Sequence, residues 1–140
     1  MAVHVLTVLA YKDGERCTSA FLAGSVNTNP VIIRRLLLAL QRAKLIDTSK
    51  GAGAGSRLSR SAARINLGEI YRAVEDCESF GTPTKKPNDK CPVGHCMRKA
   101  LEKVFASAQE ALERDLEKTT LAGLIETVKA SGPCKEEKDR

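Results

Sequence analysis

Three side chains that can bind a metal or react as nucleophiles lie within the hexapeptide Cys91-Pro-Val-Gly-His-Cys96, namely the two end thiols and the imidazole of His95. A closed zinc site takes four ligands, and an iron–sulfur cluster takes three or four thiolates. The segment is therefore short of donors unless Cys77, Cys134 or a second subunit supplies the rest. We expect no cofactor, and an iron–sulfur cluster or a zinc ion on Cys91, His95 and Cys96 remains the alternative.

The same thiols are suited to redox sensing. The thiolate is the reactive form of cysteine, and neighbouring cations and a helix N-terminus favour it. Basic side chains lie beside the two thiols: Lys90, His95 and Arg98. Oxidation of Cys91 or Cys96 would then shift the helix that follows. Ordinary packing is the other interpretation, and it suits Cys17 and Cys77 best, because cysteine is often a small buried hydrophobe.

Catalysis is not expected from these residues. A Cys–His pair needs the imidazole within reach of the sulfur and a third group that orients it. Adjacent residues of a helix point about 100° apart, so His95 is poorly placed to serve Cys96. We predict that the protein is not an enzyme. The other histidine, His4, lies in an apolar helical segment, where we expect a hydrogen-bonded core side chain.

Positive charge is concentrated ahead of these thiols. The 140-residue chain has a net charge of +6; residues 1–76 hold eleven basic and six acidic residues, and residues 77–140 hold twelve and eleven. Between residues 16 and 64, nine basic residues face one acid, Asp47. A basic block joined to a nearly neutral arm is typical of a nucleic-acid-binding unit with an assembly arm. Aromatic residues make up only 4% of the chain, which argues against stacking on single-stranded bases.

The segment Asn27–Arg42 is predicted to be a basic helix that contacts nucleic acid. Asn29 can cap it, and Pro30 suits its first position. Apolar residues recur at helical spacing to form one buried stripe: Ile33, Leu36, Leu37 and Leu40. Arginines lie off this stripe, and the segment has no acid: Arg34, Arg35 and Arg42. Phosphates or base edges would match such a face; a buried helix with solubilising arginines is the alternative.

The surrounding segments predict a winged helix-turn-helix. A short helix, Ser19–Gly24, capped by Thr18 or Ser19, comes first, with Phe21 and Leu22 facing the core. After the basic helix, residues 45–49 can pair with residues 57–59 across a glycine-rich loop, which makes a wing. The loop lacks a P-loop ending, so nucleotide binding is not expected. Lys50 and Arg57 flank it, where a hairpin can reach a minor groove or phosphates.

The rest of the chain predicts an arm that needs a partner. A short helix, Leu67–Val74, is followed by a loop over residues 77–88. A long helix then begins at Val93 or Met97 and ends at Lys118, with an apolar seam that a small head cannot cover. Its simplest partner is a second copy in a two-fold dimer. A last helix is expected to begin after Thr119 or Thr120 and to end at Val128.

These segments give the expected fold class: mainly α with a small β-hairpin wing, a winged helix-turn-helix plus a long C-terminal dimerisation helix. The expected division is a DNA-binding domain (1–76), a loop that is the candidate sensor segment (77–96), dimerisation helices (97–131) and a disordered tail (132–140). The longest apolar run is far shorter than the roughly 20 residues that span a bilayer. No export signal is evident, so we expect a cytoplasmic protein with reduced cysteines.

Several stretches of the chain together form a specific pattern: Ala2-Val-His-Val-Leu-Thr-Val-Leu-Ala, Thr18-Ser, Thr28-Asn-Pro-Val-Ile-Ile-Arg-Arg-Leu-Leu, Ala43-Lys-Leu-Ile, Lys50-Gly-Ala-Gly-Ala-Gly, Ile65-Asn-Leu-Gly-Glu-Ile-Tyr-Arg-Ala-Val-Glu and Cys91-Pro-Val-Gly. With these stretches the chain resembles the Rrf-two family of winged-helix transcription regulators, which includes the iron–sulfur cluster regulator and the nitric-oxide-sensing repressor. The resemblance extends from Val3 to about Ser131.

The resemblance implies a homodimer that binds near-palindromic promoter DNA, usually as a repressor. It places the basic helix in the major groove and the wing in the minor groove. Asn29, Val31 and Arg34 match family positions that approach base edges, and Lys50 matches a wing arginine. On the residues themselves, Arg34 is expected at bases and Arg35 at phosphate.

Two features depart from the family pattern. Its members normally begin several residues earlier than Met1, and many cluster-binding members have three closely spaced cysteines where this chain has two. We therefore expect a dimeric DNA-binding regulator whose signal is read between Cys77 and Arg98. A protein-interaction adaptor with the same fold and an iron–sulfur or metal-sensing regulator are the alternatives.

Overall fold

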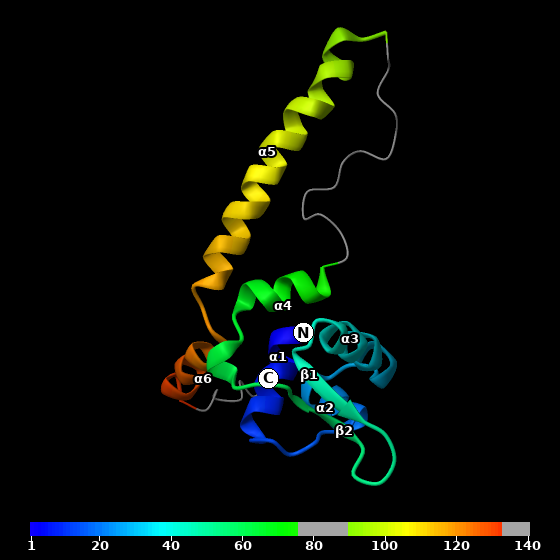
Figure 1. The fold of residues 1–140 in the computed structure, drawn as a ribbon, viewed down its shortest axis with the longest axis vertical. Helices are drawn as coiled ribbons and strands as arrows, with labels where there is room; N and C mark the ends of the chain where they lie inside the picture. The colour runs from blue at the N-terminus through cyan, green and yellow to red at the C-terminus, as the bar shows by residue number, and fades with distance from the viewer. Residues whose placement is uncertain (76–89, 133–140) are drawn as a thin grey trace, which may run out of the picture.

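The computed structural model describes residues 1–75 and 90–132, and its elements follow the expected order (Figure 1). They are α1 (Ala2–Tyr11), α2 (Ser19–Val26), α3 (Pro30–Arg42), β1 (Ile46–Ser49), β2 (Gly55–Leu58), η1 (Ala62–Arg64), α4 (Leu67–Val74), α5 (Pro92–Glu117) and α6 (Leu121–Ala130). The expectation of a mainly α fold with a small β-hairpin is confirmed. The expected loop over residues 77–88 and the tail beyond Gly132 lie outside the described residues.

Helix α1 contributes one face to the core. Its buried residues recur at helical spacing: Ala2, Val5, Leu6 and Leu9. They belong to one hydrophobic cluster with residues of other elements, among them Leu22, Ile33, Leu40, Ile65 and Leu121. The expectation that His4 is a core side chain is wrong, because His4 is exposed. On a helical wheel it lies about 150° from the middle of the buried face.

Helix α2 begins where expected and runs two residues further. The hydroxyl of Thr18 accepts a hydrogen bond from the backbone N–H of Phe21, and the helix ends at Val26 before Asn27, which has a φ of 56°. Leu22 is buried, but the expectation that Phe21 faces the core is wrong, since its side chain is exposed. The ammonium of Lys12 lies 5.3 Å from the Phe21 ring centroid, which gives the ring a cationic neighbour instead of an apolar one.

The wing is an antiparallel hairpin in which Ile46 pairs with Leu58 and Ser49 with Gly55. The second strand begins two residues earlier than expected. The reason is a further pairing outside the hairpin: Cys17 and Ser56 exchange two backbone hydrogen bonds of 2.9 Å. The segment before α2 therefore anchors the base of the wing.

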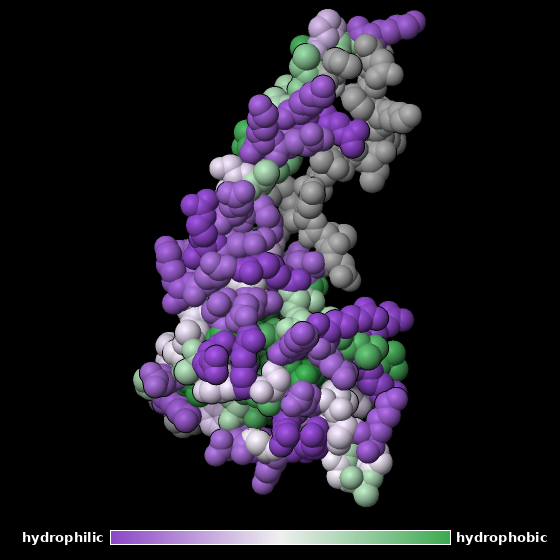
Figure 2. All heavy atoms as spheres, viewed as in Figure 1, coloured by the Kyte–Doolittle hydropathy of each residue, from purple (hydrophilic) through white to green (hydrophobic). Residues whose placement is uncertain are grey.

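Helix α5 extends away from the rest of the molecule (Figure 1). It begins at Pro92, so residues 92–96, which the expected division assigns to a loop, form its first turns. None of its described side chains is buried. Hydrophobic side chains reach the surface along its upper part in Figure 2. The largest exposed ones are Val93, Met97, Leu101, Val104 and Leu112.

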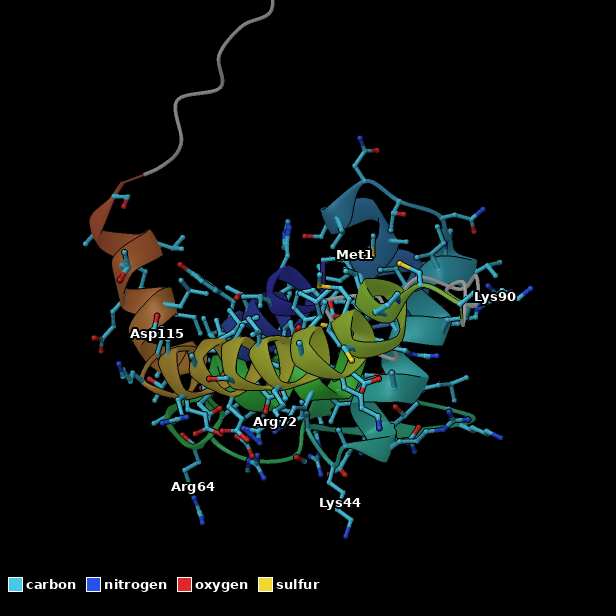
Figure 3. The ribbon with its side chains drawn as sticks, turned by 90° about the horizontal axis from the view of Figure 1, so that it is seen from above. Met1, Lys44, Arg64, Arg72, Lys90 and Asp115 are labelled. Carbon is cyan, nitrogen blue, oxygen red and sulfur yellow. The ribbon has the colours of Figure 1, made fainter. Side chains whose placement is uncertain are left out.

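Polar contacts attach the lower part of α5 to α4. The guanidinium of Arg72 pairs with Glu113 at 3.2 Å and also with Glu117, and Figure 3 shows Arg72 beneath α5. The side-chain amide of Gln109 donates to the Tyr71 hydroxyl at 3.3 Å.

Helix α6 packs back onto the N-terminal part of the chain. Leu121 and Ile125 are buried in the common core, and the N–H of Leu121 donates to the carbonyl of Ile65 at 2.8 Å. By packing, α6 is thus part of the head, which we define as residues 1–75 together with α6, although the expected division groups it with the dimerisation arm. None of the described helices has the length and apolar character to cross a membrane.

Candidate nucleic-acid interface

The outer face of α3 combines cationic and apolar side chains. Residues 31, 34, 35 and 38 follow helical spacing on the side opposite the buried stripe, and all four side chains are exposed: Val31, Arg34, Arg35 and Leu38. Of the expected buried stripe, Ile33, Leu37 and Leu40 are buried and Leu36 is half-buried. Within residues 1–75 and 90–132, no carboxylate lies within ion-pair distance of either arginine. These guanidiniums are therefore available for an external anion.

Asn29 caps the N-terminus of α3, and the cap hydrogen bond uses its side-chain oxygen. Its Oδ1 accepts a hydrogen bond of 2.8 Å from the backbone N–H of Val31, as the cap expected from the sequence. The side chain is exposed, and its amide nitrogen is the group left to face a ligand. An amide N–H can donate to the acceptor atoms of base edges or to phosphate. The amide N–H groups of Asn29 are thus the ones we expect to contact a ligand.

The wing tip lies on the same side of the head as α3, away from α6 (Figure 1). Its turn uses positive φ at Gly51 (89°) and Gly53 (73°), and the N–H of Ala54 closes it on the carbonyl of Gly51 at 3.0 Å. Lys50 is exposed at the start of this turn. A small, cationic loop of this kind can enter a narrow groove without steric conflict.

Arg57 has a different environment from Lys50. It pairs across the hairpin with Asp47, the acid that stands alone between residues 16 and 64, and both side chains are exposed. Residues directly opposite in an antiparallel pair lie close enough for their charges to interact. Among the described residues, however, no ion pair within 4.0 Å joins the two side chains, so the guanidinium of Arg57 can still bind an external anion.

Arg16 holds the wing in place, a role that the sequence did not reveal. Its Nη1 donates to the carbonyl oxygens of Gly55 (3.1 Å) and Asp47 (3.4 Å), which belong to the two strands. Together with the Cys17–Ser56 pairing, these bonds join the wing to the start of α2. The only signal for this contact in the sequence is the position of Arg16 two residues before the α2 cap, Thr18, and that position is not specific.

A cavity of about 420 Å³ separates α3 from the wing. Arg34, Leu38 and Gln41 line it from α3, and Ser49, Ala54 and Gly55 line it from the wing. Thr18 and Ser19 border it at the start of α2. The wing and α3 are therefore two separate projections on one side of the head, with room between them for an extended ligand.

Other cations extend this side of the molecule. Arg42 is exposed in the last turn of α3, and Lys44 follows it with a φ of 59° and points away from the molecule in Figure 3. With Arg34, Arg35 and Lys50, they form a cationic surface supplied by α3 and the loops around it. An anionic polymer such as a duplex backbone matches this distribution.

The candidate sensor thiols lie at the far end of α5. Cys91 is half-buried and is the N-cap, and its Sγ accepts a hydrogen bond from the N–H of Gly94 at 3.4 Å. Cys96 is exposed in the second turn. His95 belongs to the same helix between them. Cys77 and Cys134 lie outside the described residues.

The described donors do not fit an iron–sulfur cluster. A cluster takes three or four thiolates, and this end of α5 has two. Among the side chains that the structure describes, which do not include that of His95, no three His, Cys, Asp or Glu gather at metal-binding distance.

Comparison with known proteins gives one consistent family. A sequence profile described as "Rrf2: Iron-dependent Transcriptional regulator" matches residues 1–127. The chain is 38% identical over 125 residues to the HTH-type transcriptional regulator YwnA of Bacillus subtilis (strain 168), a match that covers 89% of this chain and 92% of YwnA.

Solved structures of similar fold agree with this match. One, described as a DNA-binding protein, is 35% identical with a TM-score of 0.70 and covers 89% of this chain and 95% of its own. The oxidised form of CymR from Staphylococcus aureus is 25% identical with a TM-score of 0.61 and covers 89% of this chain and 90% of CymR.

Proposed function

The chain belongs to the Rrf-two (Rrf2) family of DNA-binding transcriptional regulators, and from this premise we propose that it is a homodimeric repressor of promoters with near-palindromic sites. It is a regulator and not an enzyme. Residence in the cytoplasm, where such promoters lie, is part of the proposal. The remaining questions are which residues read DNA, how two copies pair and what signal they sense.

The observation that carries the proposal is the acid-free outer face of α3, with Arg34 and Arg35 exposed, beside a wing whose tip presents Lys50. A recognition helix in the major groove places its N-terminal residues at base edges, and a wing can reach the adjacent minor groove. We assign base contacts to Asn29, Val31 and Arg34, and phosphate contacts to Arg35. Lys50 is assigned to the minor groove, and Arg57 to phosphate.

The exposed apolar stripe of α5 supports the proposed dimer. A 26-residue helix without a buried described side chain would leave its apolar stripe in water, and a second copy is the partner that the family implies. Two-fold dimers read half-sites about 34–36 Å apart, so the angle between two α5 helices sets the distance between two α3 helices. A small rotation then weakens both half-site contacts together.

A change at the thiols is the proposed signal. Oxidation of Cys91 would alter the group that caps α5 at Gly94, and Cys96 is exposed to oxidants one turn later. The likeness to CymR, which has been solved in an oxidised form, supports this proposal. We propose that oxidation changes the first turns of α5 and so the pairing of the two arms.

A salt titration tests the proposal. The full-length protein binds duplexes that it has itself selected from random DNA, and the logarithm of its affinity should fall linearly with the logarithm of salt concentration. Arg35→Ala should lower affinity on all sequences and reduce that slope by about 1. Arg34→Ala should cost about 1–3 kcal/mol and relax the preference at one base pair.

Arg114→Ala is the matched control, because it removes an exposed arginine from α5 and should leave the slope unchanged. A flat salt dependence for the unchanged protein would contradict the proposal. If the double variant Arg34→Ala/Arg35→Ala lost operator footprints while target genes stayed regulated, the protein-interaction adaptor would be the better account.

A further inference from the structure

Two large aliphatic side chains stand on the outer face of α3 together with the arginines. Val31 is 51% exposed and Leu38 is 54% exposed. Scattered apolar residues on a surface need no explanation, but these two lie on one stripe with Arg34 and Arg35, in a helix without acids. The stripe that faces the proposed duplex is thus aliphatic at both ends and cationic in the middle.

Resting on the proposed function, we infer that Leu38 and Val31 each pack on the 5-methyl group of a thymine in the major groove. That methyl group is the apolar feature of the groove, and aliphatic side chains recognise it by contact. Leu38 lay outside the sites expected from the sequence. The signal that identifies it is an apolar residue on the cationic side of the helix.

The spacing of the two residues sets the spacing of the thymines. Seven residues of an α-helix span about 10 Å. Base pairs follow each other at about 3.4 Å along the duplex axis and somewhat further apart along the inclined groove, so the two methyl groups lie about two to three base pairs apart. The guanidiniums of Arg34 and Arg35 lie between the two aliphatic side chains, which places a guanine or a phosphate contact between the thymines. Each half-site should therefore contain two thymines with this separation.

Replacing thymine by deoxyuridine tests the inference, because it removes the methyl group and leaves base pairing intact. The full-length protein first selects its operator from random duplexes, and each thymine is then replaced singly in both half-sites. Replacement should weaken binding at two thymine positions of the half-site. The loss of one methyl group should cost about fourfold in affinity, so replacing the same position in both half-sites should cost about fifteenfold. Every other thymine should tolerate the replacement.

Variants assign each position to its residue. Leu38→Ala should abolish the response to deoxyuridine at one position, and Val31→Ala should abolish it at the other. Ile32→Ala is the matched control, since Ile32 is 47% exposed on the same helix but lies about 100° around it from Val31. It should keep both responses. Each response is a ratio measured within one variant, so a general loss of affinity cannot imitate it.

Several results would overturn the inference while the proposed function stands. One is an operator that is bound tightly but is insensitive to every replacement, as expected if Leu38 packs on deoxyribose beside the cavity. Another is a selected half-site without thymine, and a third is a response that survives both Leu38→Ala and Val31→Ala. If only one of the two variants abolished a response to deoxyuridine, the inferred methyl contact of the other residue would be refuted. Failure to select any operator would instead refute the proposed function, and this inference with it.

Discussion

The thiols of Cys17 and Cys96 differ in their surroundings, and the difference decides which of them can react. Cys17 is buried beneath the wing, and burial raises the pKa of its thiol above the 9.0 of a free cysteine. Lys12 lowers this pKa in part and Glu15 raises it further. Cys96 is exposed. A sensor thiol needs access and thiolate character, so Cys17 is a structural residue, as expected from its type.

The rate of alkylation in the native protein should therefore distinguish the thiol of Cys17 from that of Cys96. At pH 8, iodoacetamide should modify Cys17 at least about tenfold more slowly than Cys96, as measured by mass spectrometry of digested samples. In denaturant the two rates should converge. Comparable rates in the native protein would show that Cys17 is open to reagents and could itself be a switch.

The raised pKa also has a consequence for stability. Above pH 9 the thiol of the unfolded chain loses its proton before that of the folded chain, so the Cys17 contribution to the free energy of unfolding should fall as pH rises from 9 through the folded-state pKa. Below pH 9 that contribution is fully present. Comparison with Cys17→Ala, in denaturant melts from pH 7 to 10, isolates the effect from other titrating groups. Parallel curves for the two proteins would contradict it.

The wing is the element whose position depends most on one residue. Gly55 has a φ of 146°, and a Cβ at this position would lie 2.8 Å from the carbonyl oxygen of Cys17. That oxygen accepts the N–H of Ser56, so the strand has no room to retreat without losing the bond that anchors it. The close approach of two backbones therefore requires glycine.

Gly55→Ala should lower the free energy of unfolding by about 2–4 kcal/mol and loosen the wing. Gly53→Ala is the control: Gly53 also has positive φ (73°), but a Cβ there meets nothing within 4 Å. It should cost only about 1 kcal/mol. Thermal unfolding at one protein concentration compares them. Equal losses would mean that backbone strain alone, and not the contact with Cys17, makes this glycine necessary.

Local signals explain how well the elements were predicted. Thr18 caps α2, Asn29 and Pro30 begin α3, and alternating glycines form the loop of the wing, because each of these features depends on a few neighbouring residues. The buried face of a short apolar helix depends on distant partners. His4 and Phe21 were misplaced for that reason: α1 and α2 are apolar on several sides, and tertiary packing selects one.

The candidate site also contains some residues that local sequence predicts and others that depend on the tertiary arrangement. Arg34, Arg35 and Lys50 were expected on one surface, and they lie on neighbouring projections of the head. The proposed role of Leu38 and the contacts of Arg16 were not expected, because Leu38 looks like a core residue and Arg16 acts through carbonyl oxygens that the hairpin brings to it. Their roles emerge only from the arrangement of α3 and the wing.

At the scale of the whole molecule, α5 would determine how the two heads of the proposed dimer are placed. Arg72 and Gln109 fix its lower part to α4, so its direction is tied to that of the head. Val104 is 61% exposed, and small residues beside it, Ser107, Ala108 and Ala111, form a shallow groove. A partner helix can approach closely over such residues, and an apolar side chain of that partner would cover Val104. The proposed dimer therefore has its contact in the middle of α5.

A charge in this contact should separate the subunits. In the proposed dimer, Val104→Glu would bury a carboxylate between two helices, and the dimer dissociation constant should rise by at least about a hundredfold. Ala106→Glu is the matched control, since it adds the same exposed charge about 160° around the helix. Sedimentation of both variants measures the subunit equilibrium, and operator binding should be lost with the dimer, because one head contacts only one half-site. If Val104→Glu sedimented as a dimer like Ala106→Glu, another face of the molecule would have to join the subunits, and the distance between the two α3 helices would no longer depend on α5.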